Sequence, residues 1–263
     1  MKKILIIGKK SFLGSNLKIY LSKFYEVEII SFDLVLKKKI SFFLNFTHII
    51  NTAIHPNYVN KKYNAAYDLD RNFLNKFNEI KFIYIFLSSR KIYKRQELIN
   101  EKSPLQTKCN YSKNKLITEK FLKHKFNKNI LILRCSNILG RRIFSNVRNS
   151  HKLFFDNFLD YRKNNKSIVI NNDFKDFLSI EQFCLILKNI IKYNLIGIYN
   201  VSLGKKIYIS EILSWLDLNF SNKVIFKNLN ENDSFTLSNK KLIKKIKIKL
   251  TKKQVKLFCQ NLV

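Results

Sequence analysis

The chain has 263 residues, of which 46% are hydrophobic and 14% aromatic, with only 5 Gly and 2 Pro. This composition excludes a mainly disordered, collagen-like or linker-type chain, and it suits one large domain or two closely joined ones. The 50 Lys and Arg residues against 18 Asp and Glu residues leave a net charge of +32, which would attract nucleic acid, anionic lipid or anionic small molecules. Lys is nevertheless spread along the whole chain, and Lys, Asn, Ile and Phe are all residues that A/T-rich codons favour. Codon bias therefore explains the charge without a binding role. We therefore expect no nucleic-acid partner.

The spacing of the cysteines and histidines argues against a metal site or a disulfide framework. Four Cys and four His are far apart and form no Cys-x-x-Cys pair or metal-ligand pattern. The apolar run at 4–7 is too short for the core of a signal peptide, and no run approaches the length of a membrane span. We expect no metal, no membrane span and a cytoplasmic protein.

Apolar runs alternate with stretches of helical spacing along the first half of the chain. Predicted strands cover 4–7, 27–32, 48–51, 82–87 and 130–133, and predicted helices cover 11–21, 65–77 and 111–125. This alternation, with short connections, predicts an α/β fold in which helices wrap a parallel sheet. The second half is less regular, with helical patterns at 150–162, 180–192 and 210–218 and short strands at 167–170 and 198–201.

The segment 8–14 lies between the first predicted strand and the first predicted helix. Gly8 permits a tight turn, Gly14 lets helix and strand pack closely, and N–H groups at the helix start would face a pyrophosphate. Ser11 stands where a middle glycine is usual, so close backbone approach to a phosphate is less assured. The predicted cofactor turn consists of Gly8, Ser11, Phe12, Leu13 and Gly14.

Asp33 follows Gly14 by about 20 residues and ends the second predicted strand. Its carboxylate could accept both ribose hydroxyls of adenosine, which favours NAD over NADP. Two alternatives stay open. Asp33 could simply cap a turn, and the lysines at 37–39 could hold a 2′-phosphate, so the predicted cofactor is NAD or NADP.

Tyr111 and Lys115 lie one turn apart on a predicted helix. A nearby ammonium stabilises a phenolate, so Tyr111 could exchange a proton with a substrate oxygen, while Lys115 could also hold a nicotinamide ribose. Tyr58 with Lys62 fits the same spacing but is expected in a loop. Ser89 follows the strand before Tyr111 and could bond the same oxygen. The predicted catalytic residues are Ser89, Tyr111 and Lys115.

Several segments in this order resemble the extended short-chain dehydrogenase/reductase family, in its NAD-dependent epimerase/dehydratase branch. They are 8–14, 50–53, 87–93, 111–115, 133–140, 173–178 and 197–201. The resemblance implies a Rossmann-type doubly wound parallel sheet with a smaller C-terminal α/β substrate domain. We place the dinucleotide-binding domain at 1–140 and the substrate-binding region, partly interleaved with it, at 141–263.

The resemblance also implies site residues and a substrate class. Asn51, Thr52 and Ala53 would line the cofactor. Asn137 would face the nucleotide of a nucleotide-linked sugar. Lys175 stands where the family has an Arg that grips the diphosphate, and it keeps the charge without the bidentate fork. Many relatives are dimers, so a homodimer is possible.

The residues after Ser89 narrow the reaction. Arg90 and Lys91 occupy positions where a 4,6-dehydratase would have Asp-Glu, and Lys91 also stands where a fucose-type epimerase-reductase would have Cys. We expect a packing role for Cys109. The remaining reactions are reduction of a 4-ketosugar and C4 epimerisation. We favour the reductase, because the short stretch between Asp33 and His48 lacks room for the extra strand and helix of the larger epimerases. A non-catalytic nucleotide-sensing module or a basic nucleic-acid-binding protein is the alternative of another class.

Overall fold

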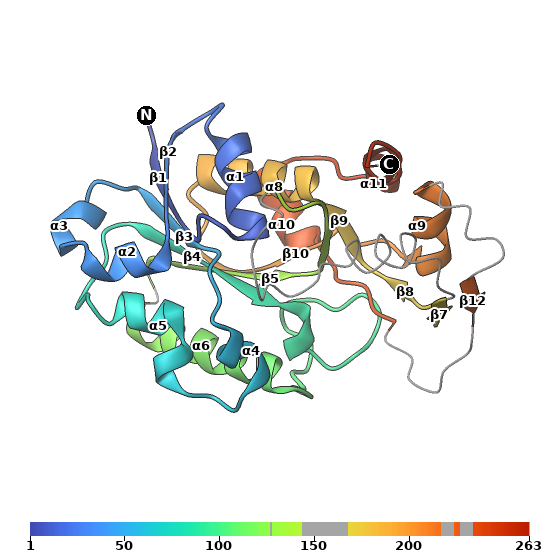
Figure 1. The fold of residues 1–263 in the computed structure, drawn as a ribbon, viewed down its shortest axis with the longest axis horizontal. Coiled ribbons are helices and arrows are strands. Elements are labelled where there is room, and N and C mark those ends of the chain that lie inside the picture. The colour runs from blue at the N-terminus through green and yellow to red at the C-terminus, as the bar shows by residue number, and fades with distance from the viewer. Residues whose placement is uncertain (127, 144–167, 217–223, 227–233, 263) are drawn as a thin grey trace.

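A six-stranded parallel sheet forms the centre of the protein (Figure 1). The computed structural model describes residues 1–126, 128–143, 168–216, 224–226 and 234–262. The strand order is β10-β5-β4-β3-β1-β2. The strands are β1 (Lys3–Ile7), β2 (Glu26–Ile30), β3 (His48–Asn51), β4 (Ile83–Ser89), β5 (Ile130–Cys135) and β10 (Gly197–Val201). The predicted parallel α/β sheet is therefore confirmed.

The strand order reverses direction at β1, which lies between β2 and β3. In open parallel sheets, a crevice opens at the carboxyl ends of the strands where the order reverses, and ligands bind there. The connection from β2 to β3 contains only two short helices, α2 (Phe32–Lys37) and α3 (Ile40–Phe43), and no strand. The stretch thus has no extra strand, as expected, but it holds two short helices where an extra helix was not expected.

Two hydrophobic clusters cover the two faces of the sheet. One contains side chains of α1 (Phe12–Leu21), α8 (Ile180–Lys192), α9 (Ile209–Trp215), α10 (Lys240–Ile246) and α11 (Lys252–Gln260). The other contains side chains of α2, α3, α5 (Leu69–Leu74) and α6 (Asn110–Phe126). Figure 1 shows α1 and α8 on one side of the sheet and α5 and α6 on the other.

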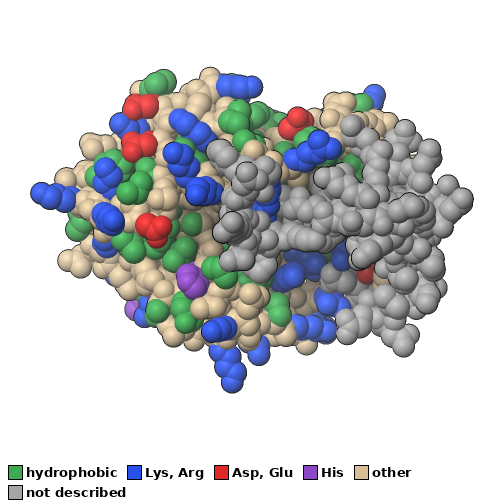
Figure 2. Space-filling model, in the orientation of Figure 1, with side chains coloured by type: hydrophobic (Ala, Val, Ile, Leu, Met, Phe, Trp, Pro, Cys, Tyr) green, Lys and Arg blue, Asp and Glu red, His purple; other side chains and the backbone are tan. Residues whose placement is uncertain are grey.

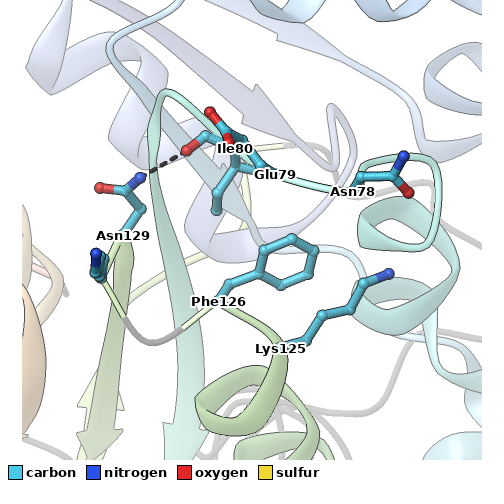
Figure 3. A pocket seen from close by; sticks show the side chains of 7 residues that line it. Asn78, Glu79, Ile80, Lys125, Phe126 and Asn129 are labelled. Carbon is cyan, nitrogen blue, oxygen red and sulfur yellow. Dashed lines mark hydrogen bonds between the residues drawn. The ribbon is translucent and has the colours of Figure 1, made fainter.

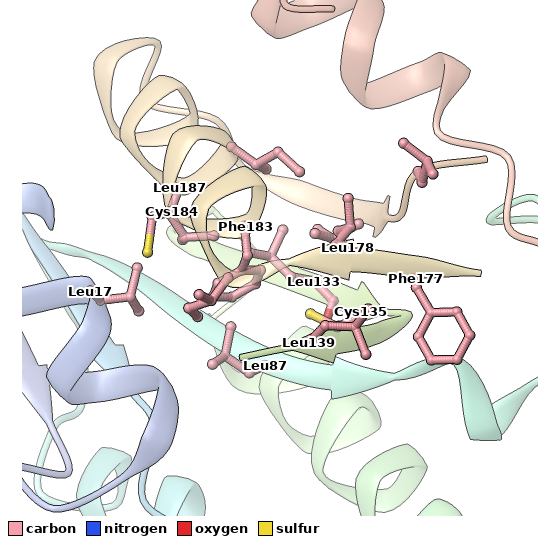
Figure 4. Packing of buried hydrophobic residues seen from close by; sticks show 14 of the residues in the cluster. Leu17, Leu87, Leu133, Cys135, Leu139, Phe177, Leu178, Phe183, Cys184 and Leu187 are labelled. Carbon is pink, nitrogen blue, oxygen red and sulfur yellow. The ribbon is translucent and has the colours of Figure 1, made fainter. Parts of the chain in front are cut away.

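Successive strand residues point to opposite clusters, which explains why the strands are continuously apolar. Ile4 and Ile6 of β1 belong to the first cluster, whereas Leu5 and Ile7 belong to the second. Figure 4 shows the first cluster where Phe183 and Leu187 of α8 lie over the sheet. A sheet buried on both faces leaves only its strand ends available for a site.

The helices begin at polar caps that the sequence supplies. The Ser11 side chain accepts from Gly14 N at the start of α1, and Ser179 forms a capping box with Gln182 at the start of α8. Thr251 does the same for α11. These caps satisfy N–H groups that would otherwise lack acceptors.

In the part of the chain that the structure describes, shorter strands form three further two-stranded sheets, separate from the main sheet. They form the pairs β6 (Asn137–Leu139) with β9 (Phe177–Ser179), β8 (Phe174–Lys175) with β11 (Ile207–Tyr208), and β7 (Ile168–Ile170) with β12 (Val224–Phe226). The predicted helix at 150–162 lies outside the described residues. No helix in the described ranges has both the length and the apolar character that a membrane span requires.

Three predicted elements differ from the structure. β2 ends at Ile30, so Asp33 does not end the strand but lies in the first turn of α2. The predicted helix at 65–77 is divided into a 3₁₀ turn (Ala65–Tyr67) and α5, because Asp68 leaves helical geometry and caps α5 with its side chain. Tyr58 lies in a short helix, α4 (Pro56–Asn60), rather than in a loop.

His48, the first residue of β3, should make folding stability sensitive to acid. Its ring is only 1% exposed, and burial, aided by the charge of Lys2, lowers the pKa of His48 to about 4. Because the ring titrates near 6.5 when unfolded, its contribution is fully present above pH 6.5 and is lost as the pH falls towards 4. The loss should approach about 3 kcal/mol of unfolding free energy. Urea denaturation across this range should show a shallower acid loss for His48→Leu than for the wild type, whereas His124→Gln, at an exposed helix position, should follow the wild type. Parallel curves for His48→Leu and the wild type would contradict the assignment.

Candidate functional site

A tight turn joins the carboxyl end of β1 to α1. Gly8 has φ of +115°, a conformation that glycine adopts readily. A Cβ on Gly8 would lie 2.5 Å from Thr52 Oγ1, and one on Gly14 would lie 2.5 Å from the Gly8 carbonyl oxygen. The turn therefore packs directly against the end of β3, and both glycines are required by close contact.

The Ser11 side chain is held on the protein side of this turn. Its hydroxyl accepts from Gly14 N at 2.9 Å and shares a hydrogen bond with Thr52 Oγ1 at 2.7 Å. Thr52 Oγ1 in turn donates to the Ile7 carbonyl at 2.7 Å. The serine thus supports the turn. The N–H groups of Phe12 and Leu13 belong to the first turn of α1, where no intrahelical acceptor exists.

Asp33 is exposed in the first turn of α2. The residue that directly follows β2 is Ser31, which is the N-cap position of α2. Gly8 N donates to the Ile30 carbonyl at 2.8 Å, so the end of β2 lies beside the turn. The carboxylate of Asp33 is therefore displaced by a short helical start from the place expected for it.

Lys115 and Tyr111 come together on α6. Lys115 is only 6% exposed, and its Nζ lies 5.9 Å from the ring centroid of Tyr111, 5.5 Å from that of Tyr58 and 4.5 Å from that of Phe86. Within the described ranges, no carboxylate lies at ion-pair distance from Lys115. Three aromatic rings therefore surround this ammonium, and such contacts attract a cation more strongly when water is excluded.

Ser89 is the last residue of β4 and lies beside Cys135 at the end of β5. Its hydroxyl accepts from Lys91 N at 3.3 Å and caps a 3₁₀ turn (Arg90–Ile92). This turn and β4 both contact α6, the helix that carries Tyr111. Ser89 is thus at the carboxyl edge of the sheet, as predicted, with contacts that link its segment to α6.

Tyr58 has the same spacing to a lysine as Tyr111, but its hydroxyl is occupied by the protein. The side chain is 3% exposed, and the hydroxyl hydrogen-bonds Thr118 Oγ1 at 2.6 Å. Burial raises the pKa of Tyr58 far above its usual range, and the negative charge of Asp68 adds to the effect. The ring of Tyr58 packs near Lys115, whereas its hydroxyl is poorly suited to proton exchange.

Asn137 and Lys175 lie close to each other in the chain's tertiary structure. Asn137 N donates to the carbonyl of Asp176, the residue after Lys175, at 3.2 Å. β6 begins at Asn137, two residues beyond the end of β5, so Asn137 is near the same sheet edge as Ser89. Both side chains are partly exposed. The structure therefore places the two predicted substrate residues in one neighbourhood, and their roles stay predictions.

A buried polar group beside Lys115 was not predicted from the sequence. Asp70 of α5 accepts hydrogen bonds at Oδ1 from Asn51 Nδ2 at 3.0 Å and from Tyr84 OH at 2.6 Å. All three side chains are buried. The available signal was the spacing of Asp70 with Phe73 and with the apolar residues at 74 and 77, which puts a carboxylate on the buried stripe of a helix.

Cys109 is exposed, so the expected packing role is wrong. Partial burial would raise the pKa of its thiol, but hydrogen bonds from Ser112 and the charge of Lys91 outweigh this and lower it. Cys109 lies just before α6, which begins at Asn110. The described residues contain no group of three or more His, Cys, Asp or Glu side chains that could hold a metal ion.

A pocket of about 340 Å³ lies at the opposite end of the sheet (Figure 3). Its lining includes Ile80, Phe126 and Asn129, which precede β4 and β5, and Asn129 Nδ2 donates to the Ile80 carbonyl at 2.6 Å. The strands are parallel, so this pocket is at their amino ends, away from the turn at Gly8. Figure 2 shows Lys and Arg side chains scattered over the described part of one face, not gathered in a single stripe.

No protein-family model and no curated protein sequence matches the chain. Solved structures match it over nearly its full length. UDP-N-acetylglucosamine 4-epimerase from Methanobrevibacter ruminantium, in complex with UDP-N-acetylmuramic acid, has a TM-score of 0.77 and 17% identity and covers 98% of this chain and 96% of its own. dTDP-glucose 4,6-dehydratase from Bacillus anthracis, in complex with NAD, has a TM-score of 0.76 and 15% identity, with 99% and 95% covered. RMD from Pseudomonas aeruginosa, complexed with NADPH, has a TM-score of 0.73 and 15% identity, with 99% and 97% covered.

These structures share the fold of this chain, and epimerases and dehydratases of nucleotide-linked sugars are the class that the sequence motifs resemble. The Rossmann-type sheet expected from that resemblance is confirmed. The low identities leave substrate and reaction to be inferred from the residues themselves.

Proposed function

We propose that this protein is an NAD(P)-dependent enzyme that acts on a nucleotide-linked sugar through Ser89, Tyr111 and Lys115. One observation carries the proposal: a buried lysine one helical turn from Tyr111, on a helix that packs beside the strand ending in Ser89. A buried charge is costly unless something uses or compensates it. The tight turn at Gly8 lies at the same edge of the sheet, which supports a site where a dinucleotide would reach from this turn to Lys115.

The residues at this edge fit a nicotinamide dinucleotide. N–H groups of Phe12 and Leu13 at the start of α1, with exposed Lys9 and Lys10 nearby, suit a pyrophosphate. Lys115 would hold the nicotinamide ribose. A bound nicotinamide supplies hydride transfer to or from a sugar carbon. Asp33 or Ser31 would meet the adenosine ribose. Ser31, not Asp33, directly follows β2, so the cofactor is NAD or NADP, and titration with each decides between them.

The chain's own residues would handle the proton and the developing charge on the sugar oxygen. Tyr111 donates or accepts the proton at that oxygen, and Ser89 hydrogen-bonds the same atom. The ammonium of Lys115 stabilises negative charge on the phenol oxygen and the sugar oxygen as the proton moves. Asn137 and Lys175 would bind the nucleotide and the diphosphate, which positions the sugar over Tyr111.

Reduction of a 4-ketosugar is the reaction we favour, and C4 epimerisation is the alternative. Both need only the hydroxyl, the phenol and the lysine. The compact connection between β2 and β3 supports the smaller reductase-type domain, and Arg90 and Lys91 after Ser89 offer no carboxyl pair for dehydration. The likeness to the UDP-N-acetylglucosamine 4-epimerase favours the alternative.

The two reactions are separated by one screen. Purified protein is incubated with NADH or NADPH and nucleotide-linked 4-ketosugars, and absorbance at the reduced-nicotinamide band is followed. Stoichiometric loss of reduced cofactor supports the reductase. Conversion between C4 epimers of UDP-hexoses without net cofactor consumption supports the epimerase. Failure to bind either cofactor would reject both.

Lys175→Ala should weaken binding of the nucleotide-linked sugar by about tenfold and leave cofactor affinity nearly unchanged, because one charge-assisted contact to the diphosphate is lost. Calorimetric titration of each ligand against the variant gives both dissociation constants. Lys175→Arg, which keeps the charge, should bind the sugar nucleotide at least as well as the wild type. Equal loss of both ligands in Lys175→Ala would count against this placement.

A further inference from the structure

We propose that Asp70 is a positioning residue that couples the ammonium of Lys115 to the cofactor turn through Asn51. The inference rests on the proposed function, because it assigns a means of control to the same site. It is carried by buried hydrogen bonds that link Asp70 to the end of β3 and to Tyr84, and by the effect of the nearby Lys115 charge on the Asp70 carboxyl.

Asp70 determines how the amide of Asn51 is oriented. An ionised carboxylate only accepts hydrogen bonds and a backbone N–H only donates, so the Asn51 amide can face them in one way alone. Its Nδ2 donates to Asp70 Oδ1 at 3.0 Å, and its Oδ1 accepts from Ala53 N at 3.0 Å. Asn51 therefore links Asp70 to the backbone that follows β3 through two hydrogen bonds.

That backbone supports the cofactor turn. Thr52, between Asn51 and Ala53, hydrogen-bonds both the Ile7 carbonyl and the Ser11 hydroxyl. A Cβ on either glycine of the turn would collide with Thr52 Oγ1. A change in the orientation of the Asn51 side chain would thus shift the turn where the dinucleotide phosphates would lie.

On the other side of Asp70, Tyr84 donates to its carboxylate, and Phe86, two residues further along the same face of β4, contacts Lys115. Its Nζ is held among the rings of Tyr58, Phe86 and Tyr111, and the described part of the chain provides no carboxylate at ion-pair distance. Lys115 is nevertheless close enough for its charge to act on the Asp70 carboxyl. Asp70 is consequently a buried anion whose charge acts on this ammonium without an ion pair, which leaves the lysine's N–H groups for a ligand.

The carboxyl of Asp70 changes charge close to physiological pH. Burial raises the pKa of Asp70 to about 6, the charge of Lys115 opposes this, and the charge of Asp68 on the same helix adds to it. Hydrogen bonds from Tyr84 and Asn51 favour the ionised form. Tyr58 also faces this group, and its own ionisation is disfavoured by the charge of Asp70. Ionised Asp70 is the form that supplies a negative charge near Lys115.

Asp70→Asn tests the charge with little change of shape, because an amide oxygen can still accept from Asn51 and Tyr84. We expect turnover of the variant to be about tenfold below the wild type at pH 8 and nearly equal to it at pH 5, where the wild-type carboxyl is protonated. The ratio of the two kcat values should therefore change with a midpoint near pH 6. A ratio that stays constant across this range would mean that Asp70 is only structural, and it would overturn the proposal.

Tyr84→Phe provides a second variant that keeps the carboxyl group. It removes the 2.6 Å hydrogen bond that favours ionised Asp70, so the midpoint should move to higher pH without disappearing. A midpoint that moves to lower pH, or does not move, contradicts the assignment of the titrating group to Asp70.

A double-mutant cycle on stability keeps this inference separable from the proposed function. Unfolding free energies are measured for the wild type, Asp70→Asn, Lys115→Met and the double variant at pH 5 and pH 8. Coupling between the two positions should be present at pH 8 and much smaller at pH 5. Coupling without any turnover would reject the proposed function and retain the Asp70–Lys115 link, whereas additive effects at both pH values would reject the link whatever the activity.

Discussion

Tyr111→Phe should lower turnover by about 10²- to 10⁴-fold and leave cofactor affinity within about twofold of the wild type. The phenol oxygen is the group proposed to exchange a proton with the sugar oxygen, and Phe keeps the ring that lies 5.9 Å from Lys115 Nζ. The surroundings of the ammonium are therefore preserved while the proton is lost. Initial rates with saturating sugar nucleotide and cofactor, together with cofactor titration by fluorescence, measure the two effects separately.

Tyr25→Phe is the matched control for this substitution. The Tyr25 hydroxyl donates to the carbonyl of Lys188 at 2.9 Å, on the face of the sheet that carries α8 and outside the proposed site. It removes one phenolic hydroxyl outside the proposed site, so its turnover should match the wild type. Unchanged turnover in Tyr111→Phe would remove Tyr111 from the mechanism, and equal losses in both variants would point to a general effect on folding.

Glu119→Ala should cost about 3–5 kcal/mol of unfolding free energy. Glu119 and Arg134 form an ion pair of 2.7 Å, with the two side chains 2% and 5% exposed. Arg134 also donates to Tyr93 OH at 2.9 Å, but without the carboxylate its buried charge is left uncompensated. The pair joins α6 to β5, so its loss loosens the helix that carries Tyr111 and Lys115. Urea denaturation monitored by circular dichroism measures the change.

A double variant, Glu119→Leu with Arg134→Met, distinguishes an uncompensated charge from a simple loss of packing. Replacing both members of a buried ion pair with apolar residues of similar size is often nearly neutral. The double variant should therefore be more stable than Glu119→Ala. A double variant less stable than Glu119→Ala would mean that the single substitution acts through lost packing. A cost below about 1 kcal/mol for Glu119→Ala would mean that this ion pair contributes no more than an exposed surface pair.

The parallel sheet could be predicted because its signals are local. Four consecutive apolar residues at 4–7 are typical of a strand buried on both faces, and this prediction is confirmed, as is the predicted strand at 48–51. The turn at 8–14 was recognisable from the spacing of its glycines between a strand and a helix. The end of β2 was missed because Ser31 and Phe32 continue an extended, apolar-looking run, whereas the backbone turns into α2.

The sequence by itself therefore determined the alternation of strands and helices around a parallel sheet, the tight turn at Gly8 and the spacing of Tyr111 to Lys115, since each depends on residues close together in the chain. Only the tertiary structure decided that Asp70 contacts Asn51, that three rings surround Lys115, and that β10 joins β5 at the edge of the sheet. Such contacts depend on which helix covers which face of the sheet and at what depth, and this is set by packing over the whole core rather than by local periodicity.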